Sequence, residues 1–483
     1  MHSINHKFIT RIVGQMCLIE ALMMVITTLV GIYYGDELLP YFTATFVYLL
    51  IGSLLLTRGR YAANTKVGRR EGMLTVTLTW LTLSLLGTVP MLMSGATDDF
   101  MSALTETISG FTTTGATVFD EVEQLPHALL FWRSLMQWQG GIGIVVVTLA
   151  LLPIFGGGAS QIYNAETTGI THDRFLPRIK DVARRLMIVY AAETLLLILL
   201  LWLGPMGLFD AICHALSCIS TGGYSTRNEG ISSFDSAYVE YVLSGFMFLG
   251  GLNIALIFFA LTGKPRQLFQ DEEFRWFSAL MLGASLATAF WLWHEGVYAS
   301  IEETFRKALF QVVSLGTSTG FLTADITSWK PFFWMLALLV MFVNGCAGST
   351  SGGLKVSRFV VLLKNLYNEF KKQVQPHLLT PVLLNGKQLS ISVVHQILAF
   401  CVLYILLLFA GAMLLMLDGN NFISGISISC SALSNSGPGI GEYMSNIGEA
   451  SDFSKGMMCF LMLAGRLEVF TVIGIFSPHF WRR

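Results

Sequence analysis

The sequence predicts an all-α membrane protein in which an N-terminal hairpin precedes four repeats, each an outer helix, a short re-entrant pore helix and an inner helix. Three observations predict this fold class. Hydrophobic residues make up 53% and charged residues 13% of the 483-residue chain, whereas soluble domains carry roughly 25% charge. Many apolar runs approach the length that spans a bilayer. A short apolar run followed by a hydroxyl-rich turn recurs four times between them.

The first 71 residues are predicted to form a transmembrane hairpin and a basic linker. The apolar runs 8–34 and 39–56 are joined by a tight acidic turn at 35–37. The first run is too long for the apolar region of a cleaved signal peptide. A linker rich in arginine and lysine then follows at 58–70.

The four repeats are predicted at 72–160, 161–265, 266–375 and 376–483. In each repeat the short run is too short to cross a bilayer, so we expect it to enter and leave on one side, where irregular backbone can line a cavity. The expected outer, pore and inner helices are 73–93, 100–110 and 127–152; 186–203, 208–219 and 238–261; 274–293, 301–315 and 332–363; and 391–417, 422–433 and 453–476.

A triplet of small polar residues ending in glycine follows each short run. Such a segment suits a filter for a bare cation, because inward-pointing backbone carbonyls replace the water of the ion and glycine permits the turn. One triplet is typical of an ordinary turn, but four at near-even spacing indicate a repeated structure. The predicted filter residues are Thr113, Thr114, Gly115, Ser220, Thr221, Gly222, Ser318, Thr319, Gly320, Asn435, Ser436 and Gly437.

A second landmark recurs in each inner run, always after the triplet. It is a pentapeptide that begins with glycine and ends with isoleucine or valine, at 140–144, 250–254, 352–356 and 465–469. In the third repeat it lies about one helical turn farther from the triplet than in the second and fourth. Two landmarks in the same order indicate that the repeat is structural.

The inner run of the third repeat contains a glycine- and hydroxyl-rich stretch that disfavours a straight helix. We expect a helix broken by a loop beneath the filter, acting as a gate; close packing of small residues is the alternative. We expect Arg466 to line the pore against this loop, the alternatives being a snorkelling arginine or a pair with Glu468. Lys355 could face the pore or the membrane interface. The candidate gating residues are Asn344, Gly345, Cys346, Ala347, Gly348, Ser349, Thr350, Ser351, Gly352, Gly353, Lys355 and Arg466.

The charges predict the topology. Basic linkers all fall on one side if the N-terminus is cytoplasmic, and the C-terminal Arg482 and Arg483 then lie there too. The filter side is richer in carboxylates, which fits either an acidic vestibule that concentrates cations or the ordinary charge bias of membrane proteins. A net charge of −1 gives no field for nucleic acid. No motif for ATP hydrolysis or covalent catalysis is evident, so we do not expect an enzyme.

These segments resemble the Trk/Ktr/HKT superfamily of cation transporters, and within it the TrkH/TrkG-type potassium uptake membrane subunits. The resemblance covers effectively the whole chain, and the N-terminal hairpin is similar to the Trk arrangement. The matching stretches are 112–117, 137–141, 163–167, 220–226, 319–325, 345–355, 435–439 and 465–468.

The resemblance implies a pseudo-fourfold pore, one in each subunit of a homodimer, in a multi-pass protein of the bacterial inner membrane. It also implies a cytosolic TrkA-like regulatory ring with Rossmann-type domains that bind NAD(H) or ATP/ADP, with no organic cofactor in this chain. In the family, serine at the first filter position separates sodium-favouring members from potassium-favouring ones with glycine. Gly115 therefore implies K⁺ as the transported ion.

We therefore expect potassium uptake through a channel-like filter, driven by the membrane potential at roughly 2.3 kcal/mol per charge per 100 mV. A sodium-permeable transporter or a Na⁺ or H⁺ symporter of the same fold is the alternative. A secondary transporter of small solutes would instead predict two repeats of many helices. A membrane-embedded enzyme would need clustered titratable groups within the spans, and these are scarce.

Overall fold

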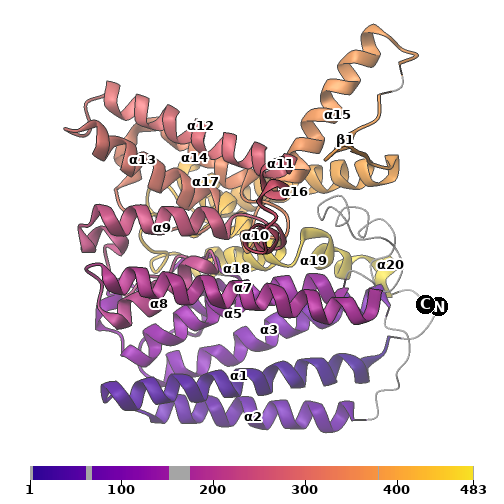
Figure 1. Cartoon of the computed structure of the whole chain (residues 1–483). Helices are drawn as coiled ribbons and strands as arrows, with labels where there is room; N and C mark the ends of the chain where they lie inside the picture. The colour runs from indigo at the N-terminus through magenta and orange to yellow at the C-terminus, as the bar shows by residue number, and fades with distance from the viewer. Residues whose placement is uncertain (1–3, 61–67, 152–174, 379, 482–483) are drawn as a thin grey trace.

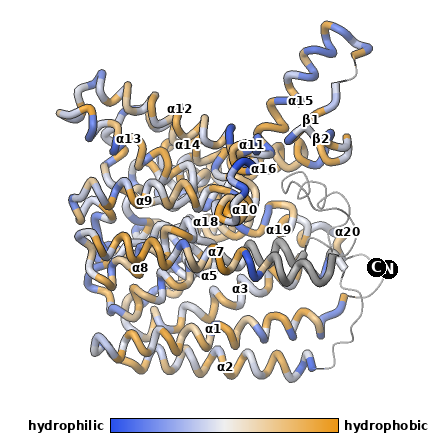
Figure 2. Tube along the Cα trace, viewed as in Figure 1, coloured by the Kyte–Doolittle hydropathy of each residue, from blue (hydrophilic) through white to orange (hydrophobic). Residues whose placement is uncertain are grey.

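The computed structural model describes residues 4–60, 68–151, 175–378 and 380–481 and is built almost entirely of helices. Within this described part, 7 helices are long and apolar enough to cross a membrane, or up to 9 if each of two bent helix pairs forms one span. The long helices run roughly side by side, and hydrophobic residues cover much of their length (Figures 1 and 2). The predicted all-α membrane fold is therefore confirmed.

The N-terminal hairpin consists of α1 (His6–Tyr34) and α2 (Leu39–Gly59), which lie together at one edge of the bundle (Figure 1). The two helices approach closely where glycines face each other. A Cβ added to Gly14 would lie 2.9 Å from the carbonyl of Gly52, so small residues permit this contact. Gly35 ends α1 with a φ of 77°, which allows the tight turn.

The outer and pore helices alternate along the chain as predicted from the apolar runs. The outer helices are α3 (Arg69–Met93), α7 (Phe175–Leu203), α12 (Glu272–His294) and α16 (Ile391–Leu417). The pore helices are α4 (Phe100–Phe111), α8 (Leu208–Ile219), α13 (Ile301–Gly316) and α17 (Phe422–Ser434), with lengths of 12, 12, 16 and 13 residues. None of these four reaches the roughly 20 residues that a span needs.

The inner helices correct the sequence analysis, which expected a break in the third repeat alone. Within the residues that the structure describes, α5 (His127–Leu151) is the one inner helix of the four without a break. In the second repeat α9 (Ala237–Gly250) and α10 (Ile254–Leu261) meet at 107°, and in the fourth α18 (Asp452–Arg466) and α19 (Val469–Phe476) meet at 116°. In the third, the 12-residue segment 344–355 separates α14 (Lys330–Val343) from α15 (Val356–Val374).

The repeated pentapeptide marks these breaks. Its last residue is the first residue of the second half-helix in three repeats: Ile254, Val356 and Val469. The residue before it has a β conformation at Asn253 and a positive φ at Lys355 and Glu468, and neither backbone conformation continues a helix. The sequence analysis predicted the break in the third repeat from its glycine and hydroxyl residues, but treated the apolar runs of the second and fourth repeats as unbroken spans.

The remaining elements are short. They include α11 (Pro265–Gln270), α20 (Pro478–Trp481) and the 3₁₀ turns η1 (Val122–Gln124), η2 (Gly230–Phe234) and η3 (Ile326–Trp329). A β-hairpin of β1 (Leu383–Leu384) and β2 (Lys387–Gln388), which the sequence analysis did not predict, follows α15. The helix α15 projects beyond the bundle, whereas the hairpin lies at its base (Figure 1), where Asn385 bonds to Asp271 and Glu272 at the start of α12.

Candidate ion pathway

Each pore helix ends in a corner with the same backbone conformation. The second residue of the corner has a left-handed φ of 53° to 56°: Thr113, Thr221, Ser318 and Asn435. A glycine two residues later has a φ of 82° to 89°: Gly115, Gly223, Gly320 and Gly437. The helix C-termini point their negative dipole ends at these corners, which favours a cation there.

The structure corrects the register of the second triplet by one residue. The sequence analysis placed Gly222 in line with the other three glycines, but Gly223 has the equivalent conformation. The second corner is therefore 220–223, and Gly222 corresponds to Thr114, Thr319 and Ser436. A serine lies six residues before the corner glycine in every repeat, at Ser109, Ser217, Ser314 and Ser431. The sequence analysis did not use this spacing, which would have given the correct register.

These four serines hold the corners in place through their backbone. In every repeat the carbonyl of the serine accepts a hydrogen bond of 2.8 or 2.9 Å from the amide of the residue before the corner glycine. The donors are the amides of Thr114, Gly222, Thr319 and Ser436. With the amide turned toward the pore helix, the carbonyl of the same residue is available to the neighbouring repeat.

The four corners close into a ring. A Cβ added to Gly115 would lie against the carbonyl of Gly222, and one added to Gly437 would lie 2.6 Å from the carbonyl of Thr114. The same holds, at separations no longer than 2.6 Å, between Gly223 and Thr319 and between Gly320 and Ser436. Each repeat thus contacts the next and the fourth contacts the first. A side chain at any of these glycines would strike a carbonyl oxygen.

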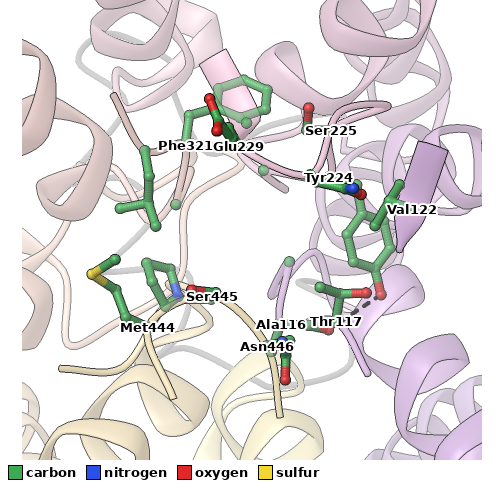
Figure 3. A pocket seen from close by; sticks show the side chains of 18 of the residues that line it. Ala116, Thr117, Val122, Tyr224, Ser225, Glu229, Phe321, Met444, Ser445 and Asn446 are labelled. Atoms are coloured by element: carbon green, nitrogen blue, oxygen red, sulfur yellow. Dashed lines mark hydrogen bonds between the residues drawn. The ribbon is translucent and has the colours of Figure 1, made fainter. Parts of the chain in front are cut away.

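A cavity of about 280 Å³ opens on one side of the ring and is lined by all four corner glycines. In Figure 3, residues from every repeat surround it: Ala116 and Thr117, then Tyr224, Ser225 and Glu229, then Phe321, then Met444 to Asn446. We call this cavity the vestibule. The vestibule therefore reaches the ring at the glycine of every corner.

The charges of the vestibule lean toward acid. Its lining includes the carboxylates of Asp120, Glu229 and Asp325 and the guanidinium groups of Arg133 and Arg227. Both arginines are paired at 2.8 Å with carboxylates, Glu106 and Asp210, that do not line the vestibule. Three carboxylates therefore remain to attract cations.

Glu106 carries a carboxylate close to the first corner but does not line the vestibule. It is fully buried on α4, and its carboxylate accepts hydrogen bonds from Arg133 Nε at 2.8 Å and from the amide of Val118 at 2.8 Å. The Arg133 guanidinium also lies 4.1 Å from the ring centroid of Tyr224. This buried pair connects the strands that leave the first and second corners, and sequence reasoning missed it because its partners are far apart in the chain.

Gln137 on α5 makes a contact that distinguishes the second corner. Its Nε2 donates to the carbonyl of Gly222 at 2.8 Å, and its Oε1 accepts from the amide of Tyr224 at 3.1 Å. The side chain is fully buried. Both ends of one amide therefore hold the peptide groups on either side of Gly223. Sequence reasoning noted the stretch 137–141 but assigned this residue no role.

Segment 344–355, which we call the intramembrane loop, lies on the face of the ring opposite the vestibule and touches three corners. Thr350 Oγ1 accepts from Thr221 Oγ1 at 3.4 Å and donates to the carbonyl of the preceding Ile219 at 3.1 Å. Gly352 N donates to Ser318 Oγ at 2.8 Å, and Asn344 Nδ2 donates to the carbonyl of Ser434 at 3.2 Å. The predicted gating residues from Asn344 to Gly353 are thus together directly below the predicted filter residues.

Arg466 completes the contact with the first repeat. Its side chain is buried, with Nη1 donating to the carbonyl of Thr350 at 2.6 Å and Nη2 to the carbonyl of Gly140 at 2.9 Å. Neither alternative from the sequence holds: the arginine does not snorkel, and Glu468 pairs with Arg358 at 2.9 Å instead. A buried guanidinium therefore joins the end of α18 to the loop and to α5.

Lys355, the last residue of the loop, points its side chain back toward earlier residues of the same loop. Its ammonium group donates to the carbonyl of Ser351 and lies 3.4 Å from Ser349 Oγ. Two positive charges, Lys355 and Arg466, thus contact the loop below the ring. The similar stretch 163–167 lies outside the described residues.

Comparison with known proteins gives one consistent result. The model of a family described as TrkH, cation transport protein, matches residues 39–483. The Trk system potassium uptake protein TrkH of Salmonella typhimurium is 36% identical over 482 residues, covering 99% of this chain and 100% of that protein. TrkG of Escherichia coli is 33% identical, with 100% of both chains covered. The crystal structure of the potassium transporter TrkH from Vibrio parahaemolyticus superposes with a TM-score of 0.91 at 33% identity, covering 99% of each chain.

Proposed function

Because this chain belongs to the TrkH family of cation transport proteins, we propose that it carries potassium into the bacterial cell through the ring of four corners. The ring carries the proposal: four glycines face the carbonyls of Thr114, Gly222, Thr319 and Ser436 in cyclic order. Carbonyls arranged in this way replace the hydration shell of K⁺ without any covalent chemistry. The names of the relatives, which specify potassium uptake, support the choice of ion.

The proposed filter comprises the twelve residues predicted from the sequence together with Gly223. Glycine at all four ring positions supports selectivity for K⁺, because it leaves the carbonyls of the neighbouring repeats unobstructed. The acidic vestibule supports a direction of approach from its side of the ring, since carboxylates raise the local concentration of cations.

The intramembrane loop and Arg466 are the proposed gate. The loop contacts three corners and, through Arg466, the first repeat. A cation that leaves the ring on this side meets the loop backbone and a guanidinium charge, which repels it. We propose that the pathway opens when the loop leaves this position, with Gly345, Gly348 and Gly353 as flexible points.

We propose further that the chain forms a homodimer and binds a cytosolic TrkA-like ring that takes up NAD(H) or ATP/ADP. Support comes from α15, which projects beyond the bundle and exposes Tyr367, Phe370 and Val374 by 60%, 57% and 81%. Exposed apolar surface of this kind is typical of an interaction site. We place α15 and both chain termini on the cytoplasmic side of the inner membrane, and divide the units at residues 71, 160, 265 and 375.

Rubidium uptake into potassium-starved cells tests the filter. Gly320→Ser puts a Cβ against the carbonyl of Ser436 at a φ of 82°, so we expect a strong loss of discrimination between potassium and sodium. Gly296→Ser is the matched control, because Gly296 also has a positive φ, 66°, but no atom within 4 Å of an added Cβ. Unchanged selectivity in Gly320→Ser, with normal expression, would remove the filter assignment.

The alternative of coupled transport has its own measurement. A symporter moves its second ion together with rubidium, so at a fixed membrane potential rubidium flux should stop when sodium is omitted from both sides, or should carry protons into the liposome in the case of a proton symporter. A channel-like pathway continues to conduct under these conditions, because the potential alone drives the ion.

A further inference from the structure

We propose that Glu273 is a positioning residue that holds the intramembrane loop across the ion pathway. This inference rests on the proposed function only in naming the loop as the gate. Glu273 is the second residue of α12 and is 5% exposed. One of its oxygens, Oε1, accepts hydrogen bonds from the amide of Ala347 at 2.7 Å and from the amide of Ser357 at 2.9 Å.

The two donors are separated by most of the loop. Ala347 lies near the beginning of the loop, whereas Ser357 is the second residue of α15, the helix that begins where the loop ends. A single carboxylate oxygen therefore draws the beginning of the loop and the start of the next helix together. Loss of this acceptor leaves two buried amides without their shared partner, which destabilises the observed position of the loop.

Glu273 also replaces a cap that α15 lacks. Lys355 precedes the helix with a φ of 77° and makes no side-chain capping hydrogen bond. The first amides of a helix need acceptors, and a negative charge there is stabilised by the helix dipole. The carboxylate of Glu273 supplies both from a neighbouring helix. It thereby couples the position of the loop to the start of α15.

The end of α12 that carries Glu273 is itself fixed by the β-hairpin. Asn385 in the hairpin turn donates through Nδ2 to Asp271 Oδ2 at 2.9 Å and accepts through Oδ1 from the amide of Glu272 at 2.7 Å. Asn385 and Gly386 have φ values of 50° and 72°, as a two-residue hairpin turn requires. A continuous set of contacts thus runs from the hairpin through residues 271–273 to the loop.

Reactivity of the native thiol at Cys346 measures the loop position without any ion flux. Cys346 is in the loop, adjacent to Ala347, and is 2% exposed. The experiment uses the full-length protein with the other six cysteines (Cys17, Cys213, Cys218, Cys401, Cys430 and Cys459) replaced by alanine. The probe is N-ethylmaleimide, added to purified protein in lipid nanodiscs. We expect Glu273→Ala to raise the labelling rate of Cys346 about tenfold or more, a factor that corresponds to about 1.4 kcal/mol.

Two further variants make the result specific. Removing a carboxylate beside a thiol also favours its ionisation, so Glu273→Gln, which keeps an Oε1 acceptor and removes the charge, separates the two effects. We expect its rate to lie well below that of Glu273→Ala. Equal rates for the alanine and glutamine variants would overturn the proposal. Glu369→Ala, on the exposed side of α15, is the control for a lost surface carboxylate.

Asn385→Ala tests the same contact from the surface and decides the matter if Glu273→Ala does not yield folded protein. We expect a smaller increase in Cys346 labelling with unchanged potassium-over-sodium selectivity; wild-type labelling in this folded variant would contradict the proposal.

Rubidium flux in the same samples separates the role of Glu273 in holding the loop from the role of the loop as a gate. Faster labelling without faster flux keeps Glu273 as the holding residue and removes the gate role of the loop, whereas faster flux without faster labelling removes the role of Glu273.

Discussion

The Nη1 atom of Arg466 donates a hydrogen bond of 2.6 Å to the carbonyl of Thr350, a residue 116 positions earlier in the chain. The same guanidinium reaches Gly140 on α5, so one side chain joins the first, third and fourth repeats beneath the ring. A buried cation in this position both holds the loop and opposes the exit of a transported cation. Its substitution therefore gives the most direct test of the proposed gate.

We expect Arg466→Gln to increase rubidium flux about tenfold in proteoliposomes that contain no regulatory partner. Glutamine can bond to one of the two carbonyls but cannot bridge them or carry the charge, and hydrogen bonds to charged groups contribute roughly 1.5–3 kcal/mol. The control is Arg275→Gln, because Arg275 is exposed and donates only to the nearby carbonyls of Phe269 and Gln270. Wild-type flux in a well-folded Arg466→Gln sample would show that this residue does not restrain conduction.

Deletion of residues 345–353 should raise the flux further than any single substitution. The deletion removes the loop contacts to Ile219 and Ser318 and takes away the partner of Arg466 at Thr350. Rubidium flux in proteoliposomes and size-exclusion chromatography in detergent check conduction and folding together. A variant that folds as well as the wild type and conducts no better would refute the loop as a gate.

Gln137→Met should reduce discrimination between potassium and sodium by about tenfold while rubidium still permeates. Methionine has a similar volume but cannot donate to the carbonyl of Gly222 or accept from the amide of Tyr224. Leaving such groups unsatisfied costs roughly 1–3 kcal/mol, and relaxation would shift one of the four ring carbonyls. Competition of sodium with rubidium uptake measures the effect. Gln124→Met, at an exposed position on η1, should leave the competition curve unchanged.

Asp99→Ala should lower the free energy of unfolding by about 1 kcal/mol, the usual loss for a helix N-cap. The Asp99 carboxylate accepts hydrogen bonds from the amides of Met101 and Ser102 at 3.2 and 2.8 Å at the start of α4. Thermal unfolding in detergent, monitored by tryptophan fluorescence, measures the change. The neighbouring exposed Asp98, replaced by alanine, should change it little.

The pH dependence of this cap has a definite sign. The hydrogen bond from the Ser102 hydroxyl to Asp99 holds the pKa of this carboxyl below its ordinary value of 3.8. The ionised form is therefore favoured in the fold, and its contribution is fully present at neutral pH. It is lost as the pH falls below 3.8 through the lowered pKa. The difference between wild type and Asp99→Ala should shrink over that range; a difference that grows with acidification would contradict this account.

Much of the fold followed from local properties of the chain. The long apolar runs predicted the spans of α1, α2 and the four outer helices, and the short runs predicted the pore helices within a residue or two. Three of the four corner glycines, Gly115, Gly320 and Gly437, were predicted for the same reason, because positive φ values favour glycine whatever surrounds it. The repeated pentapeptide was recognised as structural, but a helix break was predicted only in the third repeat, where glycine and hydroxyl residues cluster.

The register of the second corner shows where local reasoning ended. Gly222 and Gly223 can each adopt a positive φ, so the triplet pattern did not distinguish them. The carbonyl of Gly222 faces Gly115 and accepts from Gln137, and these contacts with the first repeat leave the left-handed conformation to Gly223. Contacts between repeats, rather than the composition of the corner, made this choice.

The sequence by itself determined that the chain is helical, lies in a membrane and repeats four times, because hydrophobic length and glycine conformation act over a few residues. Only the tertiary structure decided that the corners meet in a closed ring and that the inner helices of the second and fourth repeats also break. It likewise decided that Arg466 bonds to Thr350 and not to Glu468, and that Glu273 reaches both Ala347 and Ser357. These contacts join residues far apart in the chain. A buried charge takes whichever partners the packing brings to it, and no local pattern encodes that choice.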